Sequence, residues 1–361
     1  MVAFSEAVAF AALLTECPAL ESRPSDAIQA GFHAHFAEMS WQVMPSYITR
    51  LVDWIGPSGS SDGPLLAARA EAFRIFFGIQ ERVLVEVAEG LRGARLEHCL
   101  LKGTASRLNL YPSPDLRGGI DLDFAIPANA AHEGRRIARE MGFEQSAWDE
   151  RARTFVKATP EQREWIDANH YELGFLIRRH TVDGLSADQA AAIRRQLHLQ
   201  PNPWHEMPDQ GLGVWINLDL HTGLSHDIPV EPLLRDARIH RHCGVDLPVP
   251  PPAWQLFHTI YKLYWEGVFS YGKGIYQYAD ICRLAPRMDA DDVDEFVHLL
   301  GYWRLEAAAR HVLCHLPTAF GVVLPSGLDE FMAFSDRPAP GIKPQEENNF
   351  GSVWRKLWGY R

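Results

Sequence analysis

Two aspartates separated by one residue give the clearest chemical signal in this sequence. Asp121 and Asp123 alternate with a set of apolar residues, Ile120, Leu122, Phe124 and Ile126. Alternation with a period of two predicts a β-strand that directs both carboxylates to one face. Their Cα atoms would lie about 6.6 Å apart, because a strand rises roughly 3.3 Å per residue. This spacing suits carboxylates that converge on two metal ions about 4 Å apart.

A turn upstream of this strand has the residues that phosphate binding needs. A strand is predicted from Leu96 to Leu101, and it ends in Lys102, Gly103 and Thr104. A glycine followed by a hydroxyl residue at a strand-to-helix turn brings backbone N–H groups and an O–H group close to a phosphate. The order strand, turn, short helix, loop and strand is therefore expected from Leu96 to Ile126.

Two basic residues near these strands have two interpretations each. Arg117 precedes the aspartate strand, and its guanidinium could contact a triphosphate or only pair with Asp115. Lys102 could contact phosphate or be an ordinary surface lysine at a strand end. We favour a ligand role for Arg117 and leave Lys102 open.

Two later alternating segments could each bring a third carboxylate to the sheet. One contains Glu172, and the other contains Asp219 with His221 on the same face. Asp219 is the predicted ligand, because Glu172 is flanked on its own face by Gly174 and reaches one methylene further. His221 would orient Asp219 or the substrate, and a hydrogen-bonded core histidine is the alternative.

An Asp-x-Asp pattern on its own is weak evidence, because it arises roughly once by chance in a chain of this length and charge content. Asp289 and Asp291 have the same spacing. They stand where a helix is predicted to begin, and acidic residues are favourable at that end of the helix dipole. We interpret the second pair as a helix start and Asp121 with Asp123 as the site.

Three stretches, LLKG, YPSPDLRGGIDLDF and INLDLHTGL, resemble the DNA polymerase β-like nucleotidyltransferases. The closer resemblance is to a divergent branch of uncharacterised nucleotidyltransferases, over roughly residues 84–284. The positions that carry it are Lys102-Gly103, Tyr111-Pro112, Arg117, Asp121-x-Asp123 and Asp219-Leu220-His221. Better-known members have serine where this chain has Thr104, and the gap between the turn and the carboxylates is longer here.

The resemblance implies an enzyme that transfers a nucleoside monophosphate from an NTP, such as ATP, to an acceptor and releases pyrophosphate. Its cofactors would be two Mg²⁺ ions, with Mn²⁺ as an alternative. The catalytic metal ligands would be Asp121, Asp123 and Asp219. The nucleotide-binding residues would be Lys102, Gly103, Thr104 and Arg117. A catalytically silent binding protein and a metal-dependent phosphodiesterase are the alternatives, and the acceptor could be a small molecule, a peptide or protein side chain, or an RNA end.

The predicted fold class is α+β, with a small mixed nucleotidyltransferase sheet and flanking helices. An N-terminal helical segment precedes the sheet and a C-terminal helical bundle follows it. The predicted divisions are residues 1–93, 94–249 with an insert at about 181–213, 250–335 and an extended tail at 336–361. The insert is expected to contact the acceptor. His258 and Lys262 lie one helical turn apart in the bundle, and together with His221 they are the further substrate-binding candidates.

Composition excludes several other classes of protein. The 361 residues are 47% hydrophobic and carry a formal charge of −11, which disfavours an extended nucleic-acid surface. The apolar run Ala7–Leu14 is too short for a membrane span and lacks the basic start of a signal peptide, so we expect a cytoplasmic protein. The five cysteines show no spacing typical of a zinc site. A complete set of zinc ligands is also missing from three histidine clusters, His33-x-His35, His240-x-His242-Cys243 and His311 with His315.

Overall fold

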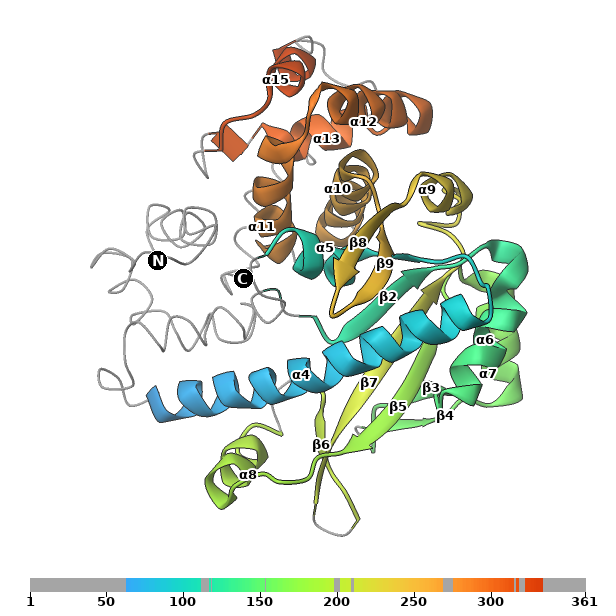
Figure 1. Cartoon of the computed structure of the whole chain (residues 1–361), viewed down its shortest axis with the longest axis vertical. Helices are drawn as coiled ribbons and strands as arrows, with labels where there is room; N and C mark the ends of the chain where they lie inside the picture. Colours follow the sequence, from blue (N-terminus) through green and yellow to red (C-terminus); the bar gives the residue numbers. More distant parts are fainter. Residues whose placement is uncertain are drawn as a thin grey trace. The chain divides into compact units, whose positions relative to one another are not determined.

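The structure is a computed structural model of the chain, and Figure 1 shows its elements. The described residues are 63–111, 117, 119–152, 154–197, 202–208, 211–268, 275–314, 316–317 and 322–333. The predicted helices within residues 1–62 and the predicted tail at 336–361 lie outside them. The chain divides into two compact units. The sheet unit comprises Pro64–Asn109 and Ser113–Pro250, and the helical unit comprises Met1–Gly63, Leu110–Pro112 and Pro251–Arg361.

A mixed sheet forms the centre of the sheet unit, in the strand order β1-β2-β7-β5-β3-β4 with β6 paired to β7. The strands are β1 (Cys99–Leu100), β2 (Asp121–Ala125), β3 (Glu144–Asp149), β4 (Thr154–Lys157), β5 (Phe175–Thr181), β6 (Trp204–Glu206) and β7 (Leu212–His221). Only β2 and β7 run parallel among these described pairs, whereas the others are antiparallel. The predicted mixed sheet with flanking helices is confirmed.

The long helix α4 (Gly63–Gly93) lies across this sheet (Figure 1). Its fully buried Phe76 and Leu84 share one hydrophobic core with Leu122 and Phe124 of β2. Helix α4 therefore belongs to the sheet unit rather than to the separate N-terminal segment predicted over residues 1–93. Because Leu122 and Phe124 are buried in this core, the alternating aspartates of β2 must face the other side of the sheet.

Shorter elements complete the sheet unit. They are α5 (Lys102–Asn109), the 3₁₀ turn η2 (Ala128–Ala130), α6 (Ala131–Glu140), α7 (Pro160–Asn169), α8 (Ala187–Arg194), α9 (Glu231–Asp236) and the hairpin β8 (Arg238–His242) and β9 (Val245–Val249). Capping boxes at Thr159 and Ser186 begin α7 and α8. The predicted insert thus contains α8 and β6, and β6 extends the sheet by pairing with β7.

Left-handed residues explain where two sequence predictions differ from the structure. The alternating segment that contains Glu172 forms a strand only from Phe175 onward, because Gly174 has a φ of 75° and interrupts the extended backbone. The helix predicted to begin at Asp289 and Asp291 ends at Arg304, whose φ is 56°. A left-handed residue ends an α-helix, so two helices form in place of one.

Besides the 3₁₀ turn η3 (Ala285–Arg287), the described part of the helical unit contains five named α-helices. They are α10 (Pro252–Val268), α11 (Ile275–Leu284), α12 (Ala290–Trp303), α13 (Glu306–Leu313) and α15 (Ser326–Ala333). The Tyr111 hydroxyl donates to Asp280 Oδ1 at 2.7 Å, and the Arg283 guanidinium lies over the Tyr111 ring. Asp289 caps α12 by accepting from the backbone N–H of Asp292 at 2.8 Å, which confirms the second Asp-x-Asp as a helix start.

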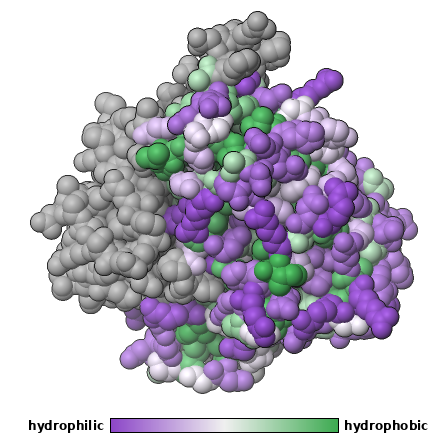
Figure 2. Space-filling view, turned by 45° about the horizontal axis from the view of Figure 1, so that its top comes forward, coloured by the Kyte–Doolittle hydropathy of each residue, from purple (hydrophilic) through white to green (hydrophobic). Residues whose placement is uncertain are grey.

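None of the described helices combines the length and the apolar character needed to cross a membrane. Figure 2 shows a face on which hydrophilic residues predominate over the described part and apolar residues form small separate patches. The expected cytoplasmic location stays a prediction.

Close packing of α6 on the sheet gives a stability prediction. A Cβ atom at Gly134 would lie 2.6 Å from Ile126 Cδ1 and 3.3 Å from Leu220 Cδ1. Both side chains are fully buried, so they have little room to move. Gly134→Ala should lower the free energy of unfolding by about 1–3 kcal/mol, as measured by urea unfolding.

The matched control is Gly78→Ala in α4, where a Cβ atom would meet nothing within 4 Å. Because alanine has the higher helix propensity, this control should be neutral or stabilising by up to about 1 kcal/mol. Equal destabilisation in both variants would contradict the packing argument.

Candidate active site

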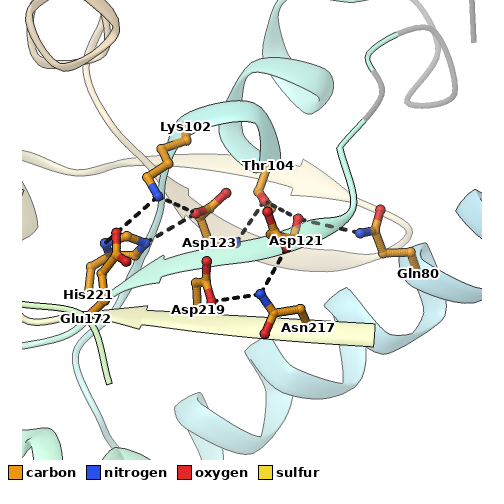
Figure 3. Close-up of polar contacts among 9 residues, drawn as sticks. All are labelled: Gln80, Lys102, Thr104, Asp121, Asp123, Glu172, Asn217, Asp219 and His221. Carbon is orange, nitrogen blue, oxygen red and sulfur yellow. Dashed lines mark hydrogen bonds and ion pairs between the residues drawn. The ribbon is translucent and has the colours of Figure 1, made fainter. Parts of the chain in front are cut away.

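The parallel register of β2 and β7 brings four polar residues together. Asp121 pairs with Asn217, and Asp123 pairs with Asp219. Residues paired across neighbouring strands direct their side chains to the same face, and Figure 3 shows these side chains grouped beside one another. The three carboxylates predicted as metal ligands therefore meet on two adjacent strands.

Asn217 holds two of these carboxylates in place. Its Nδ2 donates to Asp121 Oδ1 and to Asp219 Oδ1, each at 2.9 Å. One amide thus orients a carboxylate from each strand toward the same space (Figure 3). Asn217 is a site residue that sequence reasoning missed. Its position two residues before Asp219, on the same face of an alternating strand, is the signal that could have found it.

Lys102 is the ammonium closest to the carboxylates among the described residues. Its Nζ lies 2.9 Å from Asp123 Oδ1 and 3.4 Å from Glu172 Oε1. Burial alone would lower the pKa of Lys102, but the charges of Asp123, Glu172 and Asp219 raise this pKa well above its ordinary value. Lys102 therefore stays protonated and balances part of the negative charge.

His221 and Glu172 complete the group. His221 is fully buried, with Nε2 at 3.2 Å from Asp123 Oδ1 and Nδ1 at 3.3 Å from Glu172 Oε1. Burial, followed by the charge of Lys102, lowers the pKa of His221, which favours the neutral ring. An isolated bridge between Glu172 and His221 brings Glu172 to the site although it lies outside β5.

The carboxylates of the two strands differ in their affinity for protons. Burial raises the pKa of Asp219 well above its usual range, and the charges of Asp121 and Asp123 raise it further. Burial would also raise the pKa of Asp123, but Lys102 and His221 hold it below its usual range. Negative charge on Asp219 therefore needs a further cation close by.

The excess of negative charge around Asp219 and the types of donor atom both fit a divalent cation. Donor atoms of Asp123, Asp219 and His221 all lie within 4.8 Å of one another. Carboxylate oxygens are the ligands that Mg²⁺ prefers, whereas an imidazole nitrogen is better suited to transition metals. The carboxylates thus suit Mg²⁺, and His221 beside them is consistent with Mn²⁺ as the alternative.

The Lys102 turn is held by contacts within the fold, and the predicted contacts of Gly103 and Thr104 with phosphate stay a prediction. The Thr104 hydroxyl is buried, where it accepts from the Asp123 N–H at 2.9 Å and donates to the Asp121 carbonyl at 3.4 Å. Thr104 therefore holds α5 against β2. A Cβ atom at Gly103 would lie 3.0–3.1 Å from three atoms of the Arg117 guanidinium, so glycine allows Arg117 to approach the turn closely.

Arg107 is a further cation that sequence reasoning missed. It lies four residues after Gly103 on α5 and is buried, with Nη1 donating to Gln80 Oε1. Its buried Nε and Nη2 have no hydrogen-bond partner among the described residues. Burial lowers the pKa of Arg107 to about 10. Its position on the short helix that follows the Lys102 turn is the signal that could have indicated it.

An exposed aromatic surface continues the carboxylate face across the sheet. Phe175 is 44% exposed and precedes Leu176, which pairs with Leu218. The period of two therefore places Phe175 beside Asp219 on the same face. Phe155 on β4 is partly exposed and extends this surface, because its ring centroid lies 5.3 Å from that of Phe175. The buried Trp215 of β7 packs against Phe155, with ring centroids 5.4 Å apart.

The remaining predicted substrate residues belong to the helical unit. His258 is buried on α10, and Lys262 on the same helix is partly exposed. Their contribution to substrate binding stays a prediction. Pro112 of the predicted Tyr-Pro motif lies outside the described residues.

Comparison with known proteins covers the same region of the chain. Residues 66–321 match a protein family that is described as uncharacterised nucleotidyltransferases. The match includes all of the carboxylates, the Lys102 turn and helices α10 to α13 of the helical unit. No curated protein matches the sequence.

Removal of the Lys102 ammonium should destabilise the fold, because the carboxylates around it repel one another. Lys102→Met should lower the free energy of unfolding by about 1–3 kcal/mol in the presence of a chelator, because Asp123 and Glu172 lose their buried cationic partner. Added Mg²⁺ should reduce this loss by neutralising the same charge. Urea unfolding with and without Mg²⁺ measures both effects.

Lys157→Met is the matched control, since Lys157 pairs with Glu144 at 2.5 Å but both side chains are more than half exposed. An exposed pair contributes at most about 1 kcal/mol, and Mg²⁺ should not change the effect of its loss. Lys102 would not balance the carboxylate charge if both variants lost the same free energy of unfolding. The same conclusion would follow if Mg²⁺ did not change the stability of Lys102→Met.

Proposed function

Because the chain belongs to this family of uncharacterised nucleotidyltransferases, we propose that it transfers a nucleoside monophosphate from an NTP to an acceptor and releases pyrophosphate in a metal-dependent reaction. The observation that carries the proposal is the convergence of Asp121, Asp123 and Asp219 on one face of two parallel strands. Transfer requires the acceptor oxygen or nitrogen to bond to the α-phosphorus while the bond between the α- and β-phosphates breaks.

The three aspartates would hold two Mg²⁺ ions. Bound there, these ions supply charge neutralisation for the triphosphate and lower the pKa of an acceptor hydroxyl. Lys102 keeps Asp123 ionised, and Asn217 keeps Asp121 and Asp219 turned toward the same space. The protein thus supplies an ordered set of oxygen ligands before substrate arrives.

The two guanidinium groups near the Lys102 turn are suited to the phosphates. Arg117 lies against Gly103, and Arg107 has two buried N–H groups without a partner among the described residues. A planar guanidinium binds phosphate oxygens through two parallel hydrogen bonds. Lys102 is less suited to this role, because a contact with phosphate would weaken its ion pairs with Asp123 and Glu172.

Two alternatives differ from transfer in their products. A catalytically silent binding protein would leave the NTP unchanged, and a metal-dependent phosphodiesterase would release the free nucleoside monophosphate. The complete set of three carboxylates with an orienting amide favours an active enzyme, because a binding protein has no need for three mutually repelling charges.

The main test is a transfer assay with labelled ATP and GTP, Mg²⁺ and a cell extract as the source of acceptors. The expected result is pyrophosphate plus a nucleotidylated product identified by mass spectrometry. We assign Asp219 mainly to the ion that would activate the acceptor, whereas Asp121 and Asp123 would also hold the ion bound to the triphosphate. Asp219→Asn should therefore lower transfer by on the order of a thousandfold while the affinity for Mg²⁺-NTP changes by less than about tenfold.

Asp289→Asn is the control and should leave transfer unchanged. Asp289 shares the Asp-x-Asp pattern but caps α12, and asparagine caps a helix equally well. Free nucleoside monophosphate as the sole product would favour the phosphodiesterase. Equal activity of the Asp219→Asn variant and the unmodified protein would remove Asp219 from the site.

The exposed aromatic surface beside Asp219 favours acceptors that carry an apolar or planar group. Stacking on an aromatic side chain contributes roughly 1–3 kcal/mol. Phe175→Ala should therefore lower transfer to the acceptor by about five- to a hundredfold, with the Mg²⁺-NTP affinity from calorimetry unchanged.

Trp165 is the matched control for Phe175, because it is an exposed aromatic residue at 58% on α7, a helix that carries none of the candidate site residues. Trp165→Ala should leave transfer unchanged. Weaker NTP binding by Phe175→Ala would instead assign the surface to the nucleobase.

A further inference from the structure

The turn of the β8–β9 hairpin lies against α4 and carries two metal-binding residue types. His242 ends β8, and Cys243 with Gly244 forms the connection to β9. Both connecting residues are left-handed, with φ values of 50° and 81°. A two-residue hairpin turn of this kind ordinarily has Asn-Gly or Gly-Gly, so the turn itself does not explain a cysteine.

Helix α4 supplies a third donor from far away in the sequence. Glu81 Oε1 lies 2.7 Å from His242 Nε2 and 3.9 Å from Cys243 Sγ, and Sγ lies 3.4 Å from His242 Nε2. Figure 1 shows the turn of the hairpin directed toward α4. The sequence pattern His240-x-His242-Cys243 lacked a complete ligand set, and Glu81 adds the missing carboxylate.

We propose that Glu81, His242 and Cys243 bind a divalent transition-metal ion, with Zn²⁺ as the best fit. A tetrahedral zinc ion about 2.0–2.3 Å from each ligand atom places those atoms roughly 3.3–3.8 Å apart. The separations of Sγ from Nε2 and from Oε1 already lie near this range. Only the hydrogen bond between His242 and Glu81 must widen, by about half an ångström.

The chemistry of the donors selects the ion. A thiolate and an imidazole favour Zn²⁺ over Mg²⁺, whereas the oxygen-rich carboxylate site favours Mg²⁺. Three protein ligands leave a fourth position for water or for His240, whose ring centre is 6.4 Å from that of His242. Binding would displace the Cys243 proton to solvent, because the thiolate is the ligand.

Metal binding at Glu81, His242 and Cys243 would also stabilise the candidate active site. Glu81 follows Gln80, whose side chain donates to the Gly119 carbonyl at 3.1 Å and accepts from Arg107. An ion that joins the hairpin to Glu81 would therefore restrain the segment of α4 that supports Arg107 and the approach to β2. This role is separate from nucleotidyl transfer and does not rest on it.

The test uses the full-length, reduced protein after treatment with a chelator, titrated with Co²⁺ as a spectroscopic substitute for Zn²⁺. A near-ultraviolet band from charge transfer between thiolate and Co²⁺ should saturate at about one equivalent and disappear when Zn²⁺ is added. Cys243→Ser should abolish the band, and Glu81→Gln should weaken Co²⁺ binding at least tenfold.

Matched controls test the assignment of each ligand. Cys314→Ser removes the other exposed thiol of the described residues, and Glu89→Gln removes a different carboxylate of α4, so both variants should keep the band. Asp219→Asn should also keep it, which separates this proposal from the nucleotidyl-transfer site. In the unmodified protein, Zn²⁺ should protect Cys243 from alkylation, as measured by peptide mass spectrometry.

The absence of a thiolate band would overturn the proposal, as would a band unchanged in the Cys243→Ser variant. Alkylation of Cys243 that proceeds equally fast with and without Zn²⁺ would do the same, even if the Cys243→Ser variant did not fold.

Discussion

Repulsion among carboxylates on one face of the sheet is the constraint that the candidate active site must satisfy. Asp121, Asp123, Asp219 and Glu172 lie together, and Lys102 is the ammonium that contacts two of them. Like charges in a partly buried site are costly unless cations or hydrogen bonds offset them. Three side chains reduce this cost by contacting the carboxylates: Asn217, His221 and Lys102.

Helix α4 contacts both the candidate active site and the β8–β9 hairpin. Its apolar side packs on the sheet, and its polar residues Gln80 and Glu81 point to different partners. Gln80 contacts Arg107 and the approach to β2, whereas Glu81 contacts the β8–β9 turn. One helical turn thus links the proposed phosphate-binding cation with the proposed zinc site.

Strands and helices with regular patterns could be predicted from the sequence. Alternation indicated β2 and β7, and the acidic pair Asp289 and Asp291 indicated the start of α12. The breaks at Gly174 and Arg304 could not be read from these patterns, because a single left-handed residue changes direction without changing hydrophobic periodicity. The β8–β9 hairpin was missed for a related reason, since its turn contains cysteine where asparagine or glycine is usual.

The sequence by itself determined which residue types lie on which face of each strand. It also indicated Asp121, Asp123 and Asp219 as site residues and the family to which the chain belongs. Only the tertiary structure decided that Asp123 lies beside Asp219, because periodicity says nothing about which strands pair or in which register. The same limit applies to Glu81 and Cys243, which are separated by 162 positions. Contacts between distant segments depend on packing of the whole chain, and no local pattern records them.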